Sequence, residues 1–351
     1  MYRLRPLINR LASRGGSSPE FFLSSADDSL VIAEPMKRAG NQAVILGTEL
    51  ELITRMQNNV LYEDVFETLS AGEMTSGQTT CYIFRNALVH DGSIFNRRSH
   101  YHIRPRKGHL FPPPRTARKS SGFLCTNWVI EKYFGHWLRE GLMLNLLGQQ
   151  LGLEPIVFNR KPWIHEPEYR KLARCEVEPV ESVIFDELVI ADDRALNECW
   201  KNRIDLLRTR LIGAQPLPAN KLVYMMRGKT GIGRTLVNED AVVEYLSARG
   251  FEILLPEAVT VAEIRRVLTE AKLVICVEGS AQDHALMFMQ TGTRILTIQP
   301  ADQFNASFKP LCDFVGLTWG ACVATGQNQK YIMDLDRLSV SIDLIMGKQC
   351  W

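Results

Sequence analysis

The chain has 351 residues, of which 46% are hydrophobic and 23% are charged. This length predicts two domains with sizeable apolar cores and excludes a small disulfide-stapled fold, while the composition excludes a disordered or fibrous protein. The formal net charge of +2 gives no general reason to expect a nucleic-acid partner.

The eight cysteines are scattered, with no C-x-x-C pair and no histidine at zinc-finger spacing. This pattern predicts reduced thiols and a cytoplasmic protein. The basic N-terminus lacks the apolar stretch of a signal peptide, and no window holds the ~18 apolar residues of a membrane-spanning helix. Any membrane contact is therefore expected to be peripheral.

Residues 1–120 are predicted to form a strand-rich N-terminal segment. Short apolar runs alternate with polar turns, and the pair Asp91-Gly92 is typical of a hairpin. Residues 97–119 carry eight basic side chains, no acidic one and three consecutive prolines. We expect an exposed loop there, which either contacts an anionic group such as a lipid headgroup or is simply solvated. Its aromatic residues are too sparse for stacking along a nucleic-acid strand.

Residues 121–215 are predicted to complete an N-terminal domain. Apolar residues at three- and four-residue spacing predict one long helix over residues 127–151, with a break near Gly141 as an option. Strand-like runs and a second long helix, over about residues 194–211, follow. The Pro-Leu-Pro run at residues 216–218 predicts a linker.

The first long helix places His136 and Glu140 four residues apart, and therefore on one face. A histidine oriented by a carboxylate can serve as a general base near neutral pH. A buried, hydrogen-bonded structural histidine is the alternative and, taken alone, the commoner case. Zinc binding is not expected, because further ligands are missing nearby and H-E-x-x-H is absent.

Residues 216–351 alternate strands with helices, which predicts a parallel, doubly wound sheet. The strands are predicted at residues 222–226, 251–255, 273–277 and 294–298. Asn238 is expected to cap one helix, and Thr260 with Glu263 forms a capping box for another. Ligands of such sheets bind at the carboxyl ends of the strands, where loops lead into helix N-termini.

Two polar loops at strand ends are the first candidates for this site. Residues 227–234 combine Arg227, Lys229 and Arg234 with glycines, which suits a diphosphate, although neither the Walker nor the dinucleotide glycine pattern is present. A merely solvated loop is the alternative. The loop that holds Glu257 either contacts a base or ribose or simply connects a strand to a helix.

The third candidate loop holds Glu278, Gly279 and Ser280 and leads to Asp283 and His284. Gly279 permits close approach of a ligand to the backbone. Ser280 with Asp283 gives a capping-box pattern whose helix N-terminus would face an anion. Capping alone explains Asp283, whereas Glu278 ends an apolar strand and needs a partner there.

Asp334 and Asp336 spell a D-x-D triplet of the kind that can bind a metal. They precede apolar residues at helical spacing, so we interpret them as helix capping. No pattern in the sequence predicts a metal site or a bound cofactor.

Taken together, these stretches resemble glycosyltransferase family 61. Members typically have an aromatic-rich H-W-L helix, then R-x(n)-R-x-x-x-N-E, G-F-E-x-x-x-P-E and an H-G-A-G-L type turn. The matching stretches, in the same order, are residues 133–140, residues 227–239, residues 250–257 and residues 278–281. The likeness covers about residues 122–303. Glu278 and Ser280 depart from it, because His and Ala are usual at those positions.

The resemblance implies an α/β protein of the GT-B type, with two facing Rossmann-like domains and a strand-rich N-terminal segment. The domain of residues 121–215 would lie on the side of a glycan or glycolipid acceptor, with residues 97–119 as a contact for an anionic acceptor. The domain of residues 216–351 would bind a nucleotide-sugar donor. The donor-binding residues would be Arg227, Lys229, Arg234, Asn238, Glu257, Glu278, Gly279 and Ser280.

The same resemblance implies an inverting glycosyltransferase, working in surface polysaccharide assembly without a bound metal or cofactor. Inversion needs one base, for which His136 oriented by Glu140 is our first candidate. Glu278, Asp283 and His284 are its rivals, since they are expected where the donor's sugar should lie. If the usual His acts in catalysis, Asp283 or His284 would contribute in its place.

Two other classes of protein remain as alternatives. A non-catalytic nucleotide-binding or scaffold protein on the same fold is favoured by the departure at Glu278. A dinucleotide oxidoreductase is disfavoured, because the glycine fingerprint is missing.

Overall fold

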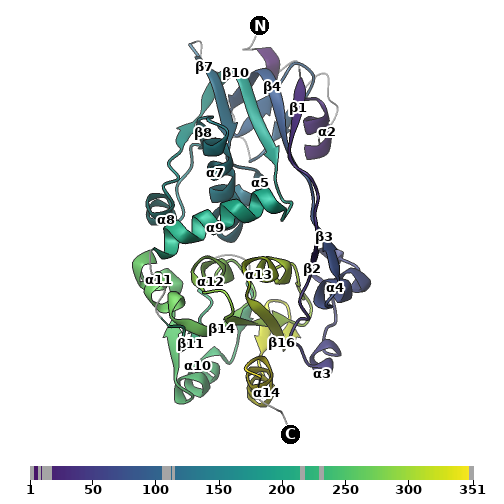
Figure 1. The fold of residues 1–351 in the computed structure, drawn as a ribbon, viewed down its shortest axis with the longest axis vertical. Helices are drawn as coiled ribbons and strands as arrows, with labels where there is room; N and C mark the ends of the chain where they lie inside the picture. Colours follow the sequence, from purple (N-terminus) through teal and green to yellow (C-terminus); the bar gives the residue numbers. More distant parts are fainter. Residues whose placement is uncertain are drawn as a thin grey trace. The chain divides into compact units, whose positions relative to one another are not determined.

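The computed structural model describes residues 4–6, 9, 18–104, 112, 115–213, 218–228 and 233–347. The chain divides into two compact units (Figure 1). Unit 1 comprises residues 1–36 and 76–204, and unit 2 comprises residues 37–75 and 205–351. Both are built on a sheet with helices, which confirms the predicted α/β class.

Unit 1 contains an eight-stranded sheet in the order β6-β5-β4-β10-β7-β8-β9, with β1 paired to β4. Its elements are α2 (Pro19–Ser24), β1 (Asp28–Ala33), β4 (Thr79–His90), β5 (Ser93–Phe95), β6 (His100–His102), β7 (Ala117–Leu124), α5 (Trp128–Lys132), α6 (Phe134–His136), η3 (Trp137–Gly141), α7 (Leu142–Gln150), β8 (Pro155–Phe158), α8 (Glu166–Ala173), β9 (Glu178–Val180) and β10 (Ser182–Asp192). Helix α9 (Glu198–Ile212) begins in unit 1 and ends in unit 2.

The unit 1 sheet is half parallel and half antiparallel. Strands β10, β7, β8 and β9 run parallel, whereas β4 is antiparallel to β10, β1 and β5. The predicted hairpin at Asp91-Gly92 is confirmed between β4 and β5, and both turn residues have positive φ, at 47° and 72°. A strand-rich N-terminal region therefore meets a Rossmann-like half.

The predicted single helix over residues 127–151 is wrong in its continuity. Asn127 caps α5 by accepting hydrogen bonds from Val129 and Ile130, but Tyr133 then has extended backbone angles and separates α5 from α6. The chain does not break at Gly141. Instead, residues 137–141 form a π-helical turn that continues directly into α7, and their buried side chains hold this turn in the interior of the unit.

Unit 2 contains a seven-stranded sheet in the order β12-β17-β16-β15-β14-β11-β13. Its elements are β2 (Lys37–Ala39), α3 (Gly47–Leu50), η2 (Gln57–Asn59), α4 (Tyr62–Leu69), β3 (Glu73–Thr75), β11 (Lys221–Met225), β12 (Thr235–Leu236), α10 (Glu239–Ala248), β13 (Phe251–Leu254), η4 (Pro256–Ala258), α11 (Val261–Thr269), β14 (Ala271–Val277), α12 (Gln282–Phe288), β15 (Arg294–Pro300), α13 (Lys309–Val315), β16 (Thr318–Gln327), β17 (Lys330–Ile332) and α14 (Leu335–Ile345).

The predicted parallel, doubly wound sheet is confirmed in unit 2. Strands β13, β11, β14, β15 and β16 are parallel neighbours. Helices α10 and α14 bury apolar side chains against one face of the sheet, and α11, α12 and α13 pack on the other (Figure 1). Burial on both faces explains why these strands are almost continuously apolar in sequence.

The unit boundaries differ from the predicted domain boundaries at residues 120 and 215. Residues 37–75 leave the N-terminal segment and pack with unit 2. The fully buried Glu49 of α3 accepts a hydrogen bond from the backbone N–H of Val323 and pairs with Arg337 at 3.1 Å. Both partners of Glu49 lie more than 270 positions away in the sequence, so no local pattern encodes this contact.

None of the helices in the described part of the chain has the length and hydropathy of a membrane span.

Candidate functional site

Unit 2 has a topological switch point between β11 and β14. Apart from the two-residue edge strand β12, the next strand after β11 is β13 on one side, and the next strand after β14 is β15 on the other. In open parallel sheets, the carboxyl ends of two such strands border the usual ligand crevice. Residues 226–228 follow β11 and residues 278–280 follow β14, so the first and third predicted loops meet at this place.

Two arginines surround Glu278 at the switch point. Nη1 of Arg234 lies 2.6 Å from Oε2 of Glu278, and both side chains are more than nine-tenths buried. Asn305 donates from Nδ2 to Oε1 of Glu278 at 3.1 Å. Arg227 donates from Nη1 to the backbone carbonyl of Glu278. The partner that the buried Glu278 carboxylate needs at the end of this apolar strand is therefore Arg234.

Gly279 is required by its backbone conformation and lies close to the guanidinium group of Arg227. Its φ of 142° lies where side chains are rarely tolerated, and a Cβ here would collide with Arg227. Burial lowers the pKa of Arg227, and the charge of nearby Arg234 lowers it further. Two positive charges thus share one corner, which is the electrostatic setting for an anion.

The other predicted donor-binding residues have mixed surroundings. The carboxylate of Glu257 lies against Gly228, so it reaches the loop after β11. Asn238 stands at the N-cap position of α10, but its side chain instead holds the backbone of Met333 through two hydrogen bonds. Ser280 is half-buried beside Gly279. Lys229 lies outside the described residues.

The predicted capping box of Ser280 and Asp283 is wrong. Helix α12 begins one residue later than the pattern suggests, with Ala281 at the N-cap and no side-chain capping bond. Asp283 and His284 lie in the first turn with 1% and 3% of their surfaces exposed. The sequence pattern missed this because burial of the whole first turn, rather than local capping, defines the start of the helix.

In unit 1, His136 and Glu140 meet as their spacing predicts. Nδ1 of His136 lies 2.6 Å from Oε1 of Glu140, across the π-helical turn. Burial would raise the pKa of Glu140, but the hydrogen bond from His136 and the positive charge of Arg139 outweigh it and lower that pKa. An ionised Glu140 accepts the Nδ1 proton, which leaves the lone pair of the imidazole on Nε2.

Arg139 lies against the face of the same imidazole. Its Nη2 is 3.2 Å from Nδ1 and 3.1 Å from Nε2. An atom in line with the Nε2 lone pair would be much farther from Nδ1 than from Nε2, so these equal distances place Arg139 over the ring plane. An acceptor hydroxyl that approaches Nε2 would therefore share this nitrogen with the guanidinium group of Arg139.

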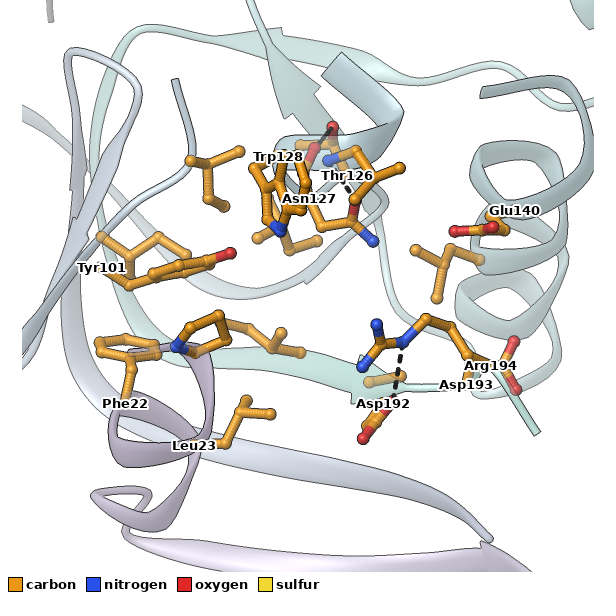
Figure 2. Close-up of a pocket in the computed structure, with 18 of the residues that line it drawn as sticks. Phe22, Leu23, Tyr101, Thr126, Asn127, Trp128, Glu140, Asp192, Asp193 and Arg194 are labelled. Carbon is orange, nitrogen blue, oxygen red and sulfur yellow. Dashed lines mark hydrogen bonds and ion pairs between the residues drawn. The ribbon is translucent and has the colours of Figure 1, made fainter. Parts of the chain in front are cut away.

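A pocket of about 290 Å³ lies in unit 1 at the carboxyl ends of β7 and β10 (Figure 2). These strands are parallel neighbours, so the pocket lies at the carboxyl-end edge of the parallel half of the unit 1 sheet. Figure 2 shows Phe22 and Tyr101 at one end of the pocket and Glu140 at the other. The sequence analysis found only Glu140, because the other walls come from separate segments.

The basic stretch at residues 97–119 is not one solvated loop. Part of it forms β6 and the start of β7. Arg104 is largely buried, donates to the carbonyl of Asn159 and lies over the ring of Phe158. Arg118 and Lys119 pair with acidic side chains. Residues 105–111, 113 and 114 lie outside the described residues, so the predicted membrane contact stays a prediction.

The predicted capping role of the D-x-D triplet is confirmed. Asp334 is the N-cap of α14 and accepts from the backbone N–H groups of Asp336 and Arg337. Across the described ranges, no group of three or more His, Cys, Asp or Glu side chains is arranged to hold a metal ion.

Comparison with protein families decides the class of this site. The family model described as Glycosyltransferase 61 matches residues 134–296. Residues 134–296, slightly less than half of the chain, are therefore similar to glycosyltransferase family 61. The match confirms the resemblance and supports a glycosyltransferase enzyme, which takes a nucleotide-sugar donor and an acceptor. A search of curated proteins found no match to this chain.

The family 61 match spans every predicted site residue from His136 to His284. It begins two residues before His136 and continues through both strands of the unit 2 switch point. Most walls of the unit 1 pocket, including Phe22, Tyr101 and Asn127, lie before its start. The individual roles of the site residues stay predictions.

Proposed function

We propose that this protein is an inverting glycosyltransferase, which transfers a sugar from a nucleotide-sugar donor to a hydroxyl group of a glycan or glycolipid. The observation that carries the proposal is the 2.6 Å contact between His136 and Glu140 inside the family match. Surface polysaccharide assembly in the cytoplasm is the setting that we infer. A GT-B arrangement of the two units stays a prediction.

In the proposed reaction, Nε2 of His136 takes the proton of the acceptor hydroxyl. The freed oxygen bonds to the anomeric carbon while the bond from that carbon to the donor phosphate breaks. The nucleoside diphosphate leaves with the bonding electrons, and Arg227 and Arg234 stabilise its charge without a metal. Attack opposite the leaving group inverts the anomeric centre.

Glu278 supports a second candidate function. Its carboxylate already neutralises Arg234, which is one of the two charges offered to the diphosphate. A protein that binds a nucleotide at this corner without transferring sugar is therefore the competing proposal.

Turnover separates the two candidates. The full chain should be incubated with a panel of nucleotide sugars and an extract of glycans and glycolipids, and nucleotide release followed by chromatography. Proton NMR of the product then gives the anomeric configuration. Inverted product that depends on His136 supports the transferase, whereas saturable binding without consumption of any donor supports the second candidate.

Replacing Arg227 by Ala tests the donor site itself. Loss of a charge-assisted hydrogen bond should weaken donor binding by about 1.5–3 kcal/mol. Isothermal titration with the donor measures this, and Arg249→Ala, at the end of α10, serves as a control. Equal donor affinity in the Arg227 variant and the control would remove Arg227 from the site.

A further inference from the structure

The unit 1 pocket has an aromatic end. The rings of Phe22 and Tyr101 are stacked, with centroids 5.7 Å apart and planes inclined by 30°. Trp128, 48% exposed, lines the same pocket. Flat aromatic faces complement flat, weakly polar C–H surfaces, and an exposed tryptophan retains most of its surface for such a contact.

Polar groups of the pocket keep unused hydrogen-bonding capacity. Asn127 spends its Oδ1 on capping α5, and its Nδ2 donates to no described residue. The hydroxyl of Tyr101 also makes no hydrogen bond within the described chain. Among the described residues, Asp192 has one ion-pair partner, Arg194, at the long distance of 3.6 Å. These three groups line one cavity and would each gain a partner from a hydroxylated ligand.

The charge of the pocket disfavours an anion. Its lining contains the carboxylates of Glu20, Glu140, Asp192 and Asp193, and Arg194 alone is basic among the described residues that line it. Asp193 is neutralised by Arg203 at 2.6 Å, and Glu140 is paired with Arg139 at 3.4 Å. The carboxylates of Glu20 and Asp192 and the guanidinium group of Arg194 remain, which leaves a net negative charge. An anionic ligand would therefore be repelled.

We propose that this pocket binds a neutral sugar ring of the acceptor, an assignment that rests on the proposed glycosyltransferase function. A sugar has apolar C–H faces for the aromatic end and hydroxyl groups for Tyr101, Asn127 and Asp192. An acyl chain would fill the aromatic end but would leave those polar groups buried without partners, which is costly. The volume of about 290 Å³ is at the lower limit of small-molecule sites and suits one or two sugar rings.

The position of the pocket connects it to the proposed base. Glu140 lines the pocket and also binds Nδ1 of His136. A sugar ring bound in the pocket would therefore contact Glu140, the same side chain that orients His136.

Ligand-observed NMR on the full chain tests the proposal without donor or turnover. The probes are the neutral methyl glycosides of glucose, galactose, mannose and xylose at millimolar concentration, with methyl glucuronide as the anionic comparison. Saturation transfer should reach the C–H protons of at least one neutral glycoside. A preference for the glucuronide, or no transfer to any neutral probe, would overturn the assignment.

Two variants with matched controls locate the binding. Trp128→Ala and Asp192→Asn should each weaken binding of that neutral glycoside at least tenfold. Phe21→Ala removes an aromatic ring that is 60% exposed and absent from the pocket lining, and Asp28→Asn removes an exposed carboxylate with a similarly long ion pair, to Arg85. These two controls should bind as the unmodified chain does. Equal affinity in all four variants would overturn the proposal.

The result is separable from the proposed function. If glycoside binding depends on Trp128 and Asp192 but the protein consumes no nucleotide sugar, the sugar-binding pocket is supported and the glycosyltransferase function is rejected. The opposite result is also possible: the protein consumes the donor in a reaction that depends on His136, but neither pocket variant changes glycoside binding. That result would support the transferase and show that its acceptor binds elsewhere.

Discussion

At position 278, a buried carboxylate stands beside the side chains of Arg227 and Arg234. Its bond to Arg234 satisfies both charges while the site holds no donor. A donor diphosphate that needs Arg234 has to compete with this resident anion. Donor affinity should therefore depend on Glu278 even if its side chain never touches the donor.

Glu278→Gln should tighten donor binding by about tenfold, because one guanidinium group is released for the diphosphate. The same change leaves Arg234 buried without its anion, which should cost roughly 3 kcal/mol of folding stability in the absence of donor. Thermal unfolding with and without donor measures both effects. Glu244→Gln, at an exposed carboxylate of α10, is the control. Weaker donor binding in the Glu278 variant would show that Glu278 contacts the donor directly.

His136 and Glu140 have separable roles. His136→Ala should keep donor affinity but lower turnover by roughly a hundredfold or more, because the proton acceptor is lost. Glu140→Gln should cost less, since it removes only the orienting carboxylate. Steady-state kinetics with fixed donor measures both, and thermal unfolding checks that each variant is folded. Near-normal turnover in His136→Ala would transfer the role of base to Asp283, His284 or Glu278.

The lowered pKa of Glu140 affects the stability of the folded protein at acidic pH. Because that pKa is lowered in the folded protein, the ionised carboxylate stabilises the fold above the ordinary carboxyl range, and this stabilisation is lost as pH falls through the lowered value. Acid unfolding should therefore begin at higher pH in Glu140→Gln than in the unmodified chain. Identical acid-unfolding curves would show that the hydrogen bond to His136 does not stabilise the fold.

Among the elements, α3 illustrates how a short helix far from the site is held in unit 2. Glu49 has none of its surface exposed and binds Val323 and Arg337. Glu49→Gln should lower the free energy of unfolding by roughly 3 kcal/mol, the cost of leaving a buried partner uncompensated. Urea denaturation measures this, with the exposed neighbour Glu51→Gln as the control. Equal stability in both variants would mean that α3 does not anchor residues 37–75.

The π-helical turn at residues 137–141 carries Glu140 and directly follows the proposed base, His136. It buries Trp137 and Leu138 on its inner side while His136 and Glu140 remain partly exposed. Turns of this kind are uncommon and are often found at functional sites. The geometry of the pair therefore depends on core packing as much as on the four-residue spacing.

For the whole molecule, donor binding should stabilise the unit that contains the switch point. At a donor concentration of about 100 times Kd, the gain is about 2.7 kcal/mol. Hydrogen exchange followed by mass spectrometry reports opening of each unit separately. Protection should rise in β11 and β14 and stay unchanged in β4 and β10. An equal rise in both units would mean that they open as one cooperative unit, and no rise would exclude donor binding at this switch point.

The sequence by itself determined four parallel strands of the unit 2 sheet, the helices between them, and the pairing of His136 with Glu140. These features rest on local periodicity, because alternating strands and helices and a four-residue spacing act over one or two turns of chain. The polar loops after β11 and β14 were also visible, since a charged residue that ends an apolar strand needs a partner. The sequence did not show which residue would pair with Glu278.

Only the tertiary structure decided the rest. It placed Arg234 against Glu278, moved residues 37–75 into unit 2 and assembled the unit 1 pocket from α2, β6 and the segments after β7 and β10. It also divided the predicted long helix at Tyr133. The physical reason is common to the first three: each depends on contacts between residues distant in the chain, and burial there overrides the local preferences that a sequence displays.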